Sequence, residues 1–268
     1  MKHKYKYTLQ DVKNAARPAE RDGTPVSVMF IEIFARRLTL LIANYTNFSP
    51  NTVTYIHLFF YLLAALCFFN GTTAFIMLGA MLYMTSTVLD YSDGKLARLT
   101  SRVSNKGAAL DVFIDTIGKG ILVVSLTYGL FRTAGKVIYI LVGLVILFLY
   151  LFPPELHKIK VFYTEGTSLV MGLTETEKSG KSPKPNLISK LHIDKLLRYP
   201  MKRGIRPYPT DTDADIFLYF FCPIIKFLGI ATILHVETIL FGLILYILRY
   251  SIEIPIFTYL VFKNIKEG

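Results

Sequence analysis

Residues 90–115 read DYSDGKLARLTSRVSNKGAALDVFID and carry aspartates in two pairs. Asp90 and Asp93 are three positions apart near the end of one apolar stretch, and Asp111 and Asp115 are four positions apart at the start of the next. Residues three or four apart share one face of an α-helix. A short link makes the two helices antiparallel neighbours, so we expect the two pairs to face each other at one depth.

Converging carboxylates repel one another unless cations neutralise them. A carboxylate at membrane depth costs roughly 2.5–3.5 kcal/mol on the insertion scale, and such residues usually line a polar cavity. Hard divalent cations prefer oxygen ligands, and Mg²⁺ keeps open positions for substrate phosphates. We therefore predict that Asp90, Asp93, Asp111 and Asp115 hold two Mg²⁺ ions, with Mn²⁺ as the alternative. Two such ions could clamp a pyrophosphate.

The residues between the aspartates suit a phosphate ligand. Gly94 inside a helix costs about 1 kcal/mol against alanine, and it allows close approach of a ligand to the backbone. Ala97 is equally small and lies one turn further along the same face. Arg98 offers a bidentate donor for a phosphate, and Gly107 suits the turn into the next helix.

The run matches every fixed position of D-x2-D-G-x2-A-R-x8-G-x3-D-x3-D, the signature of the CDP-alcohol phosphotransferase (CDP-alcohol phosphatidyltransferase) family. The resemblance implies transfer of a substituted phosphate from a CDP-alcohol to an acceptor hydroxyl, with release of CMP. It implies that Asp90, Asp93 and Asp111 are metal ligands. Asp115 would touch the second metal and act as the general base on the acceptor hydroxyl.

The resemblance also implies a nucleotide site. Gly94, Ala97 and Arg98 would hold the diphosphate, and Ser104 is similar to a family position that contacts the nucleotide. The segment PNTVT at 50–54 resembles the P-[ND]-x-x-T entry to the first membrane span, on the cytidine side. The predicted nucleotide-binding residues are Asn51, Thr54, Gly94, Ala97, Arg98, Ser104 and Gly107. Thr116 departs from the family pattern, in which many members have a basic residue at this position.

Composition predicts an all-α integral membrane protein with six transmembrane helices. The chain is 53% hydrophobic, with a mean hydropathy of +0.44, and contains several apolar stretches of the roughly 20 residues that a membrane helix needs. The predicted spans are 53–69, 73–98, 108–131, 136–151, 214–234 and 236–262. An amphipathic interfacial helix is expected at 26–46, before the first span.

The net charge of +11 is concentrated in the N-terminal 51 residues, the link 98–107, the segment 155–212 and the tail. This alternation with apolar spans follows the positive-inside rule, so we expect both termini in the cytoplasm and anionic lipids as partners, not nucleic acid. The predicted divisions are 1–52, 53–154 with the catalytic motif, a basic segment 155–212, and 213–268. A prokaryotic cell membrane is our expectation, and the resemblance implies a homodimer.

Three cations inside the spans are candidate acceptor contacts. Lys119 follows Asp115 by one helical turn and either binds an acceptor phosphate or forms a structural ion pair. Lys226 either joins a basic cavity wall or extends to the interface, and Arg249 either binds an anion or pairs with Glu253. If they line the cavity, the acceptor is a phosphorylated alcohol such as glycerol phosphate or inositol phosphate. His57 is expected to be a packed residue.

Other functions remain open at this stage. The leading interpretation is phospholipid synthesis with CDP-diacylglycerol as the donor, whose tails need lateral access from the bilayer. The same chemistry could use a soluble donor such as CDP-inositol, CDP-glycerol or a CDP-aminoalcohol. An aspartate-rich prenyltransferase would also need Mg²⁺, but it would not explain Gly94, Ala97, Arg98 and Gly107 together. A divalent-cation carrier would place its carboxylates nearer the middle of the bilayer than these helix ends.

Overall fold

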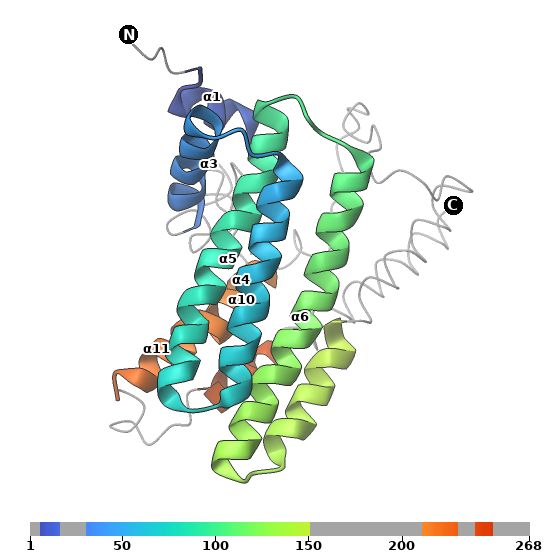
Figure 1. The fold of residues 1–268 in the computed structure, drawn as a ribbon. Helices are drawn as coiled ribbons and strands as arrows, with labels where there is room; N and C mark the ends of the chain where they lie inside the picture. Colours follow the sequence, from blue (N-terminus) through green and yellow to red (C-terminus); the bar gives the residue numbers. More distant parts are fainter. Residues whose placement is uncertain (1–5, 17–30, 151–210, 230–238, 249–268) are drawn as a thin grey trace, which may run out of the picture.

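The computed structural model describes residues 6–16, 31–150, 211–229 and 239–248, and in these ranges every regular element is helical. Four long or amphipathic helices lead to the site: α3 (Ile33–Tyr45), α4 (Pro50–Asn70), α5 (Thr73–Leu99) and α6 (Asn105–Ala134). Helices α4, α5 and α6 run side by side, with the α5–α6 link at the upper end of Figure 1 and the α4–α5 turn at the lower end. The signature is therefore split between two antiparallel helices, α5 and α6, each of which packs against α4 and not closely against the other, so the expectation of directly neighbouring helices is not met.

Local signals in the sequence set the ends of these helices. Ser49 caps α4 by accepting a hydrogen bond from the Thr52 amide, and Pro50 occupies the first turn, where its missing N–H costs nothing. Gly71 ends α4 with a φ of 78°, a left-handed conformation that glycine adopts without strain. Ser104 caps α6 in the same way as Ser49 caps α4. Ser49 and Ser104 therefore set where α4 and α6 begin, at the end of the molecule that carries the signature.

An N-terminal helix, α1 (Leu9–Ala15), lies outside the elements that the sequence predicts. Thr8 and Asp11 form a capping box, and the hydrogen bonds from the Thr8 hydroxyl and amide lower the pKa of Asp11. Asn44 on α3 accepts from the Tyr7 amide and donates to the Tyr7 carbonyl, both at 3.0 Å. The helix packs against α3 and α5, which places it at the same end of the molecule as the signature.

The amphipathic helix expected at 26–46 corresponds to α3, within the part of the chain that is described. Its buried residues Ala35, Thr39 and Ile42 face α5, and Ser92 donates to the Ala35 carbonyl. A buried ion pair joins the two helices: the Lys95 Nζ lies 2.8 Å from a Glu32 carboxylate oxygen.

The remaining helices contribute to the same core. The short helix Ile138–Tyr150 follows α6 directly, and the C-terminal part contains α10 (Asp211–Ile216), the π-helix η2 (Phe217–Phe221), α11 (Cys222–Phe227) and the short helix Ile239–Leu248. Tyr219 of η2 is fully buried, with its ring centroid 5.1 Å from that of Tyr83 on α5 and 5.9 Å from that of Phe68 on α4. The core is thus shared by the signature helices and the C-terminal ones.

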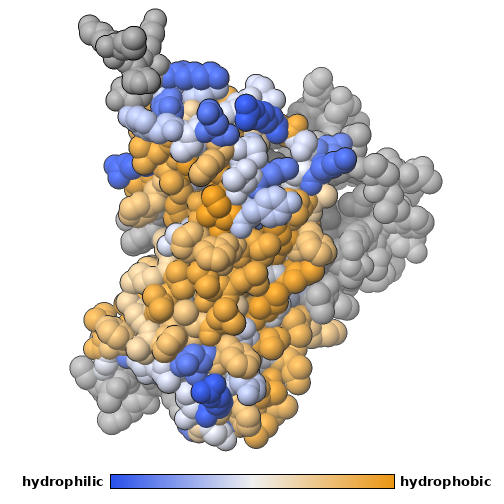
Figure 2. Space-filling view, in the orientation of Figure 1, coloured by the Kyte–Doolittle hydropathy of each residue, from blue (hydrophilic) through white to orange (hydrophobic). Residues whose placement is uncertain are grey.

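The membrane prediction is supported in part. Helices α4 and α5 are long and apolar enough to cross a bilayer by length and composition. Helix α6 is about 45 Å long at 1.5 Å per residue, but its first half carries Asp111, Asp115 and Lys119. Figure 2 shows a hydrophobic band around the middle of the visible face, with hydrophilic side chains at both ends. The six spans are not confirmed, and the predicted surface segment 155–212 lies outside the described residues except at 211 and 212.

Candidate active site

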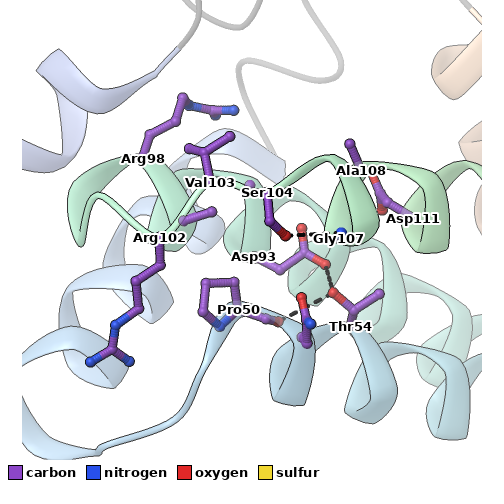
Figure 3. Close-up of a pocket in the computed structure, with 13 residues that line it drawn as sticks. Pro50, Thr54, Asp93, Arg98, Arg102, Val103, Ser104, Gly107, Ala108 and Asp111 are labelled. Atoms are coloured by element: carbon purple, nitrogen blue, oxygen red, sulfur yellow. Dashed lines mark hydrogen bonds between the residues drawn. The ribbon is translucent and has the colours of Figure 1, made fainter. Parts of the chain in front are cut away.

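A cavity of about 280 Å³ opens where the start of α4, the end of α5 and the start of α6 meet (Figure 3). All seven residues predicted to bind the nucleotide line it. Its lining residues are Pro50, Asn51, Thr54, Asp93, Gly94, Ala97, Arg98, Arg102, Val103, Ser104, Gly107, Ala108 and Asp111. The structure therefore brings the PNTVT segment and the D-G-x2-A-R run to one place, while their contact with a nucleotide stays a prediction.

Short hydrogen bonds order the walls of this cavity. The Thr54 hydroxyl donates to Asp93 Oδ2 at 2.6 Å, which orients a buried carboxylate from the neighbouring helix. The Ser104 hydroxyl accepts from the Gly107 amide at 3.0 Å. A Cβ added to Gly107 would stand 3.0 Å from that hydroxyl and 3.1 Å from Asn51 Oδ1, so glycine allows α4 and α6 to meet closely here.

Arg98 is held in place by the N-terminal helix. Its Nε donates to the Ala15 carbonyl of α1 at 2.6 Å, so the outer part of its guanidinium group is the part that can reach a phosphate. Arg102 also lines the cavity, on the link between α5 and α6. Arg102 was not among the residues predicted from the sequence, although its position four residues after Arg98 in a basic link could have indicated a second phosphate contact.

The aspartates form two groups that share Asp90. Carboxylate oxygens of Asp90, Asp93 and Asp111 lie within 4.8 Å of one another, and the same limit holds for Asp90, Asp115 and a ring nitrogen of His57. Ligands on opposite sides of one ion are about 4.2 Å apart for Mg²⁺ and about 5 Å apart for Ca²⁺. The donor chemistry and spacing therefore fit a divalent cation in either group, and Asp90 is placed to touch both.

His57, expected as a packed residue, is buried on α4 with 2% of its surface exposed. Its Nδ1 lies 3.0 Å from the Ser86 carbonyl oxygen and 2.8 Å from the Ser86 hydroxyl oxygen. Its ring also packs against that of Tyr61, with centroids 5.2 Å apart. The residue is therefore both packed, as expected, and adjacent to the carboxylates, which the sequence did not indicate.

The two predicted acceptor contacts that the structure describes, Lys119 and Lys226, lie on different helices. Lys119 forms an ion pair with Asp215 of α10, with 3.4 Å between Nζ and Oδ2, and its Nζ lies 5.9 Å from the Tyr150 ring centre. Lys226 lies in the last turn of α11, toward the lower end of Figure 1, and it does not line the cavity. Arg249 lies outside the described residues. Two roles were left open for Lys119, an acceptor-phosphate contact and a structural ion pair, and the structure shows the ion pair.

Asp215 was not predicted from the sequence as the partner of Lys119. It is 2% exposed and accepts hydrogen bonds from the hydroxyls of Tyr150 and Tyr246, the latter at 3.1 Å, besides pairing with Lys119. It lies outside the signature. The signal in the sequence that could have indicated it is the acidic run at 211–215, directly before an apolar stretch.

Residues 47–167 match the family model described as CDP-alcohol phosphatidyltransferase. No curated protein matches the chain. The matched segment includes the whole 90–115 signature, so the similarity to CDP-alcohol phosphatidyltransferases is found at residues 47–167. That family is embedded in membranes, generally uses a divalent metal and transfers a phosphate-linked alcohol group from a CDP-alcohol.

Proposed function

We propose that the CDP-alcohol phosphatidyltransferase domain at residues 47–167 transfers a phosphatidyl or other substituted phosphate group from a CDP-alcohol to an acceptor hydroxyl, releasing CMP. The observation that carries this proposal is the juxtaposition of the cavity with the carboxylates. Asp93 and Asp111 belong both to the cavity wall and to the group of carboxylates whose spacing fits a cation. A diphosphate in the cavity would lie directly against that group.

In this proposal, different residues of the chain would bind the diphosphate, the cytidine and the metal ions. Arg98 and the small residues Gly94 and Ala97 would bind and orient the diphosphate, and Asn51 and Thr54 would line the cytidine side. Divalent cations held by Asp90, Asp93, Asp111 and Asp115 would supply charge neutralisation and polarise the phosphorus. Mg²⁺ is the ion we favour, with Mn²⁺ as the alternative.

Asp115 would act as the general base in this scheme. Its carboxylate would take the proton of the acceptor hydroxyl as the new oxygen–phosphorus bond forms at the β-phosphorus. The bond from that phosphorus to the bridging oxygen breaks, and CMP leaves with the electron pair. The buried position of the neighbouring His57 and Asp93 supports a reaction site from which bulk water is restricted.

CDP-diacylglycerol is the donor that we favour. The hydrophobic band in Figure 2 would give its acyl chains lateral access to the cavity, and exposed apolar side chains on α4 such as Phe59 and Leu66 support a lipid-facing surface. A soluble CDP-alcohol remains the second candidate donor. We further propose six spans, cytoplasmic termini, a prokaryotic cell membrane and a homodimer, from the charge alternation and the family resemblance.

The acceptor is a polar alcohol in this proposal. An acceptor phosphate, as in glycerol phosphate or inositol phosphate, would have to compete with Asp215 for the Lys119 ammonium group. Because of this ion pair, binding of a phosphorylated acceptor would require another cation. Arg102, which lines the cavity, is one candidate.

The test is CMP release by the purified chain in lipid vesicles with Mg²⁺, across a panel of donors and acceptors. We expect CMP only when a CDP-alcohol and an alcohol are both present, and we expect Asp115→Asn to lower the rate by about 10²–10⁴-fold, the usual contribution of a general base. A thermal unfolding curve of Asp115→Asn that matches the parent protein would confirm that the variant is folded.

Each outcome decides between candidates. Turnover with CDP-diacylglycerol alone among the donors would support the leading donor, and turnover with CDP-inositol or CDP-glycerol would replace it. Absence of CMP in every combination, together with metal-dependent ion flux into the vesicles, would contradict the enzyme and support the divalent-cation carrier.

A further inference from the structure

We propose that His57 is a nitrogen ligand of the metal centre, binding a divalent ion through Nε2 beside Asp90 and Asp115. The proposal rests on the site of the proposed function, but it concerns a residue outside the signature and on a different helix. It assigns α4 a direct part in metal binding, in addition to lining the cavity through Asn51 and Thr54.

The first support is position. A ring nitrogen of His57 and carboxylate oxygens of Asp90 and Asp115 lie within 4.8 Å of one another, and they come from α4, α5 and α6 respectively. Three helices thus present one donor each to a common point. Only 2% of the surface of His57 is exposed, so its ring cannot turn away into solvent.

The second support is the tautomer that Ser86 imposes. The Ser86 hydroxyl donates its only hydrogen to the His57 backbone carbonyl at 3.0 Å, so its oxygen must accept from Nδ1 at 2.8 Å. The Ser86 carbonyl oxygen, 3.0 Å from Nδ1, can also only accept. Both contacts require a hydrogen on Nδ1, which leaves the lone pair of the neutral ring on Nε2.

This arrangement is the one that metal-binding histidines use. Such residues almost always donate their second ring N–H to a carbonyl or carboxylate, which fixes the tautomer and the orientation of the ring. Within the described part of the chain, Nε2 itself makes no hydrogen bond. A lone pair buried beside two carboxylates is unfavourable without a cation between them, because all the donors are electron-rich.

A nitrogen ligand also has a consequence for ion preference. Carboxylate oxygens suit Mg²⁺, Ca²⁺ and Mn²⁺, whereas imidazole suits zinc, iron and nickel ions. With His57 in the coordination sphere, the group with Asp90 and Asp115 should bind Zn²⁺ or Ni²⁺ more tightly than Ca²⁺, while the oxygen-only group of Asp90, Asp93 and Asp111 should discriminate less. The two groups would thereby differ in chemistry although they share Asp90.

Pulsed electron paramagnetic resonance of Mn²⁺ tests this without any substrate. The purified full-length chain is loaded with Mn²⁺ alone, and the electron spin-echo modulation is recorded with natural-abundance and ¹⁵N-histidine protein. We expect modulation from a directly bound ¹⁴N that changes to the ¹⁵N pattern on labelling. Since labelling alters no side chain, this part of the experiment does not depend on the folding of a variant.

Variants then assign the nitrogen to one residue. His57→Gln should abolish the modulation and weaken Mn²⁺ binding by at least tenfold, on the order of the effects seen around metal sites. Tyr61→Phe, which keeps the ring packed against His57, should preserve the modulation. Ser86→Ala should keep the nitrogen bound but lower the affinity by about 10–100-fold, because the tautomer is no longer fixed.

The result that would overturn the proposal is Mn²⁺ bound without nitrogen modulation in the parent protein, at a site that Asp90→Asn abolishes. This outcome is separable from failure of the proposed function. CMP release without nitrogen modulation would remove His57 from the metal centre and leave the transferase intact. Nitrogen modulation without CMP release would retain the metal centre and contradict the transfer reaction.

Discussion

Thr54 orients Asp93 through a hydrogen bond of 2.6 Å between two helices, and this is the scale at which the site is most sensitive. Thr54→Val keeps the shape of the side chain but removes the donor. A hydrogen bond to a charged group contributes about 1.5–3 kcal/mol, so we expect CMP release to fall by roughly 10–100-fold. Steady-state rates of Thr54→Val in vesicles measure this effect.

Thr54→Ser is the matched control for that variant. It retains the hydroxyl and should keep a rate within a few-fold of the parent protein, since only a methyl group is lost. Equal rates for Thr54→Val and the parent protein would show that Asp93 does not depend on Thr54 for its orientation.

At the scale of elements, the buried Glu32–Lys95 pair fastens α3 to the signature helix α5. Glu32 also pairs with Arg36 at 2.6 Å, so the carboxylate serves two cations. Lys95 is fully buried. Removing one partner of a buried pair leaves an uncompensated charge and costs about 3–5 kcal/mol, whereas replacing both by apolar residues is often neutral.

We therefore expect an asymmetric double-mutant cycle for this pair. Glu32→Leu should lower the thermal midpoint in detergent most, because Lys95 then keeps its charge in the interior. Lys95→Met should cost less, because Glu32 retains Arg36. The double variant Glu32→Leu with Lys95→Met should recover much of the loss, and additive effects of the two changes would contradict the coupling.

On the scale of the whole molecule, the bundle depends on a close crossing of α4 and α6 at the end opposite the site. A Cβ added to Gly129 would stand 2.0 Å from the Phe68 carbonyl oxygen, and one added to Gly71 would stand 2.0 Å from the Gly129 carbonyl oxygen. Both obstructions are backbone atoms, so the helices themselves must separate. The crossing sets the angle at which α4 and α6 approach the cavity.

Gly129→Ala should consequently destabilise the protein by about 1–3 kcal/mol, the usual range of overpacking, and lower its thermal midpoint. Gly120→Ala on the same helix is the control, because its Cβ would meet only Leu147 Cδ1 at an ordinary 3.4 Å. That change should be neutral or stabilising by up to about 1 kcal/mol, from helix propensity alone. Equal thermal midpoints for the two variants would argue against the close crossing.

Much of this architecture follows from local chemistry. The signature spacing predicted that Asp90, Asp93 and Asp111 would meet, because helical periodicity puts each pair on one face and a short link brings the two helix ends to one level. It did not predict that α5 and α6 would each pack against α4 and not against each other. Ser49 as a cap and Gly71 as the end of α4 were equally local signals. Helix α1 was missed because its capping box is a short motif in an otherwise polar arm.

By itself, then, the sequence determined the helical class, the resemblance of the 90–115 signature to one family and the residues of the carboxylate cluster, since these depend on periodicity and spacing within about 26 neighbouring residues. Only the tertiary structure decided that His57 faces Asp90 and Asp115, that Lys119 pairs with Asp215 and that α1 holds Arg98. Those contacts join helices far apart in the chain. They depend on the rotation and crossing angle of each helix, which the packing of all its neighbours sets together.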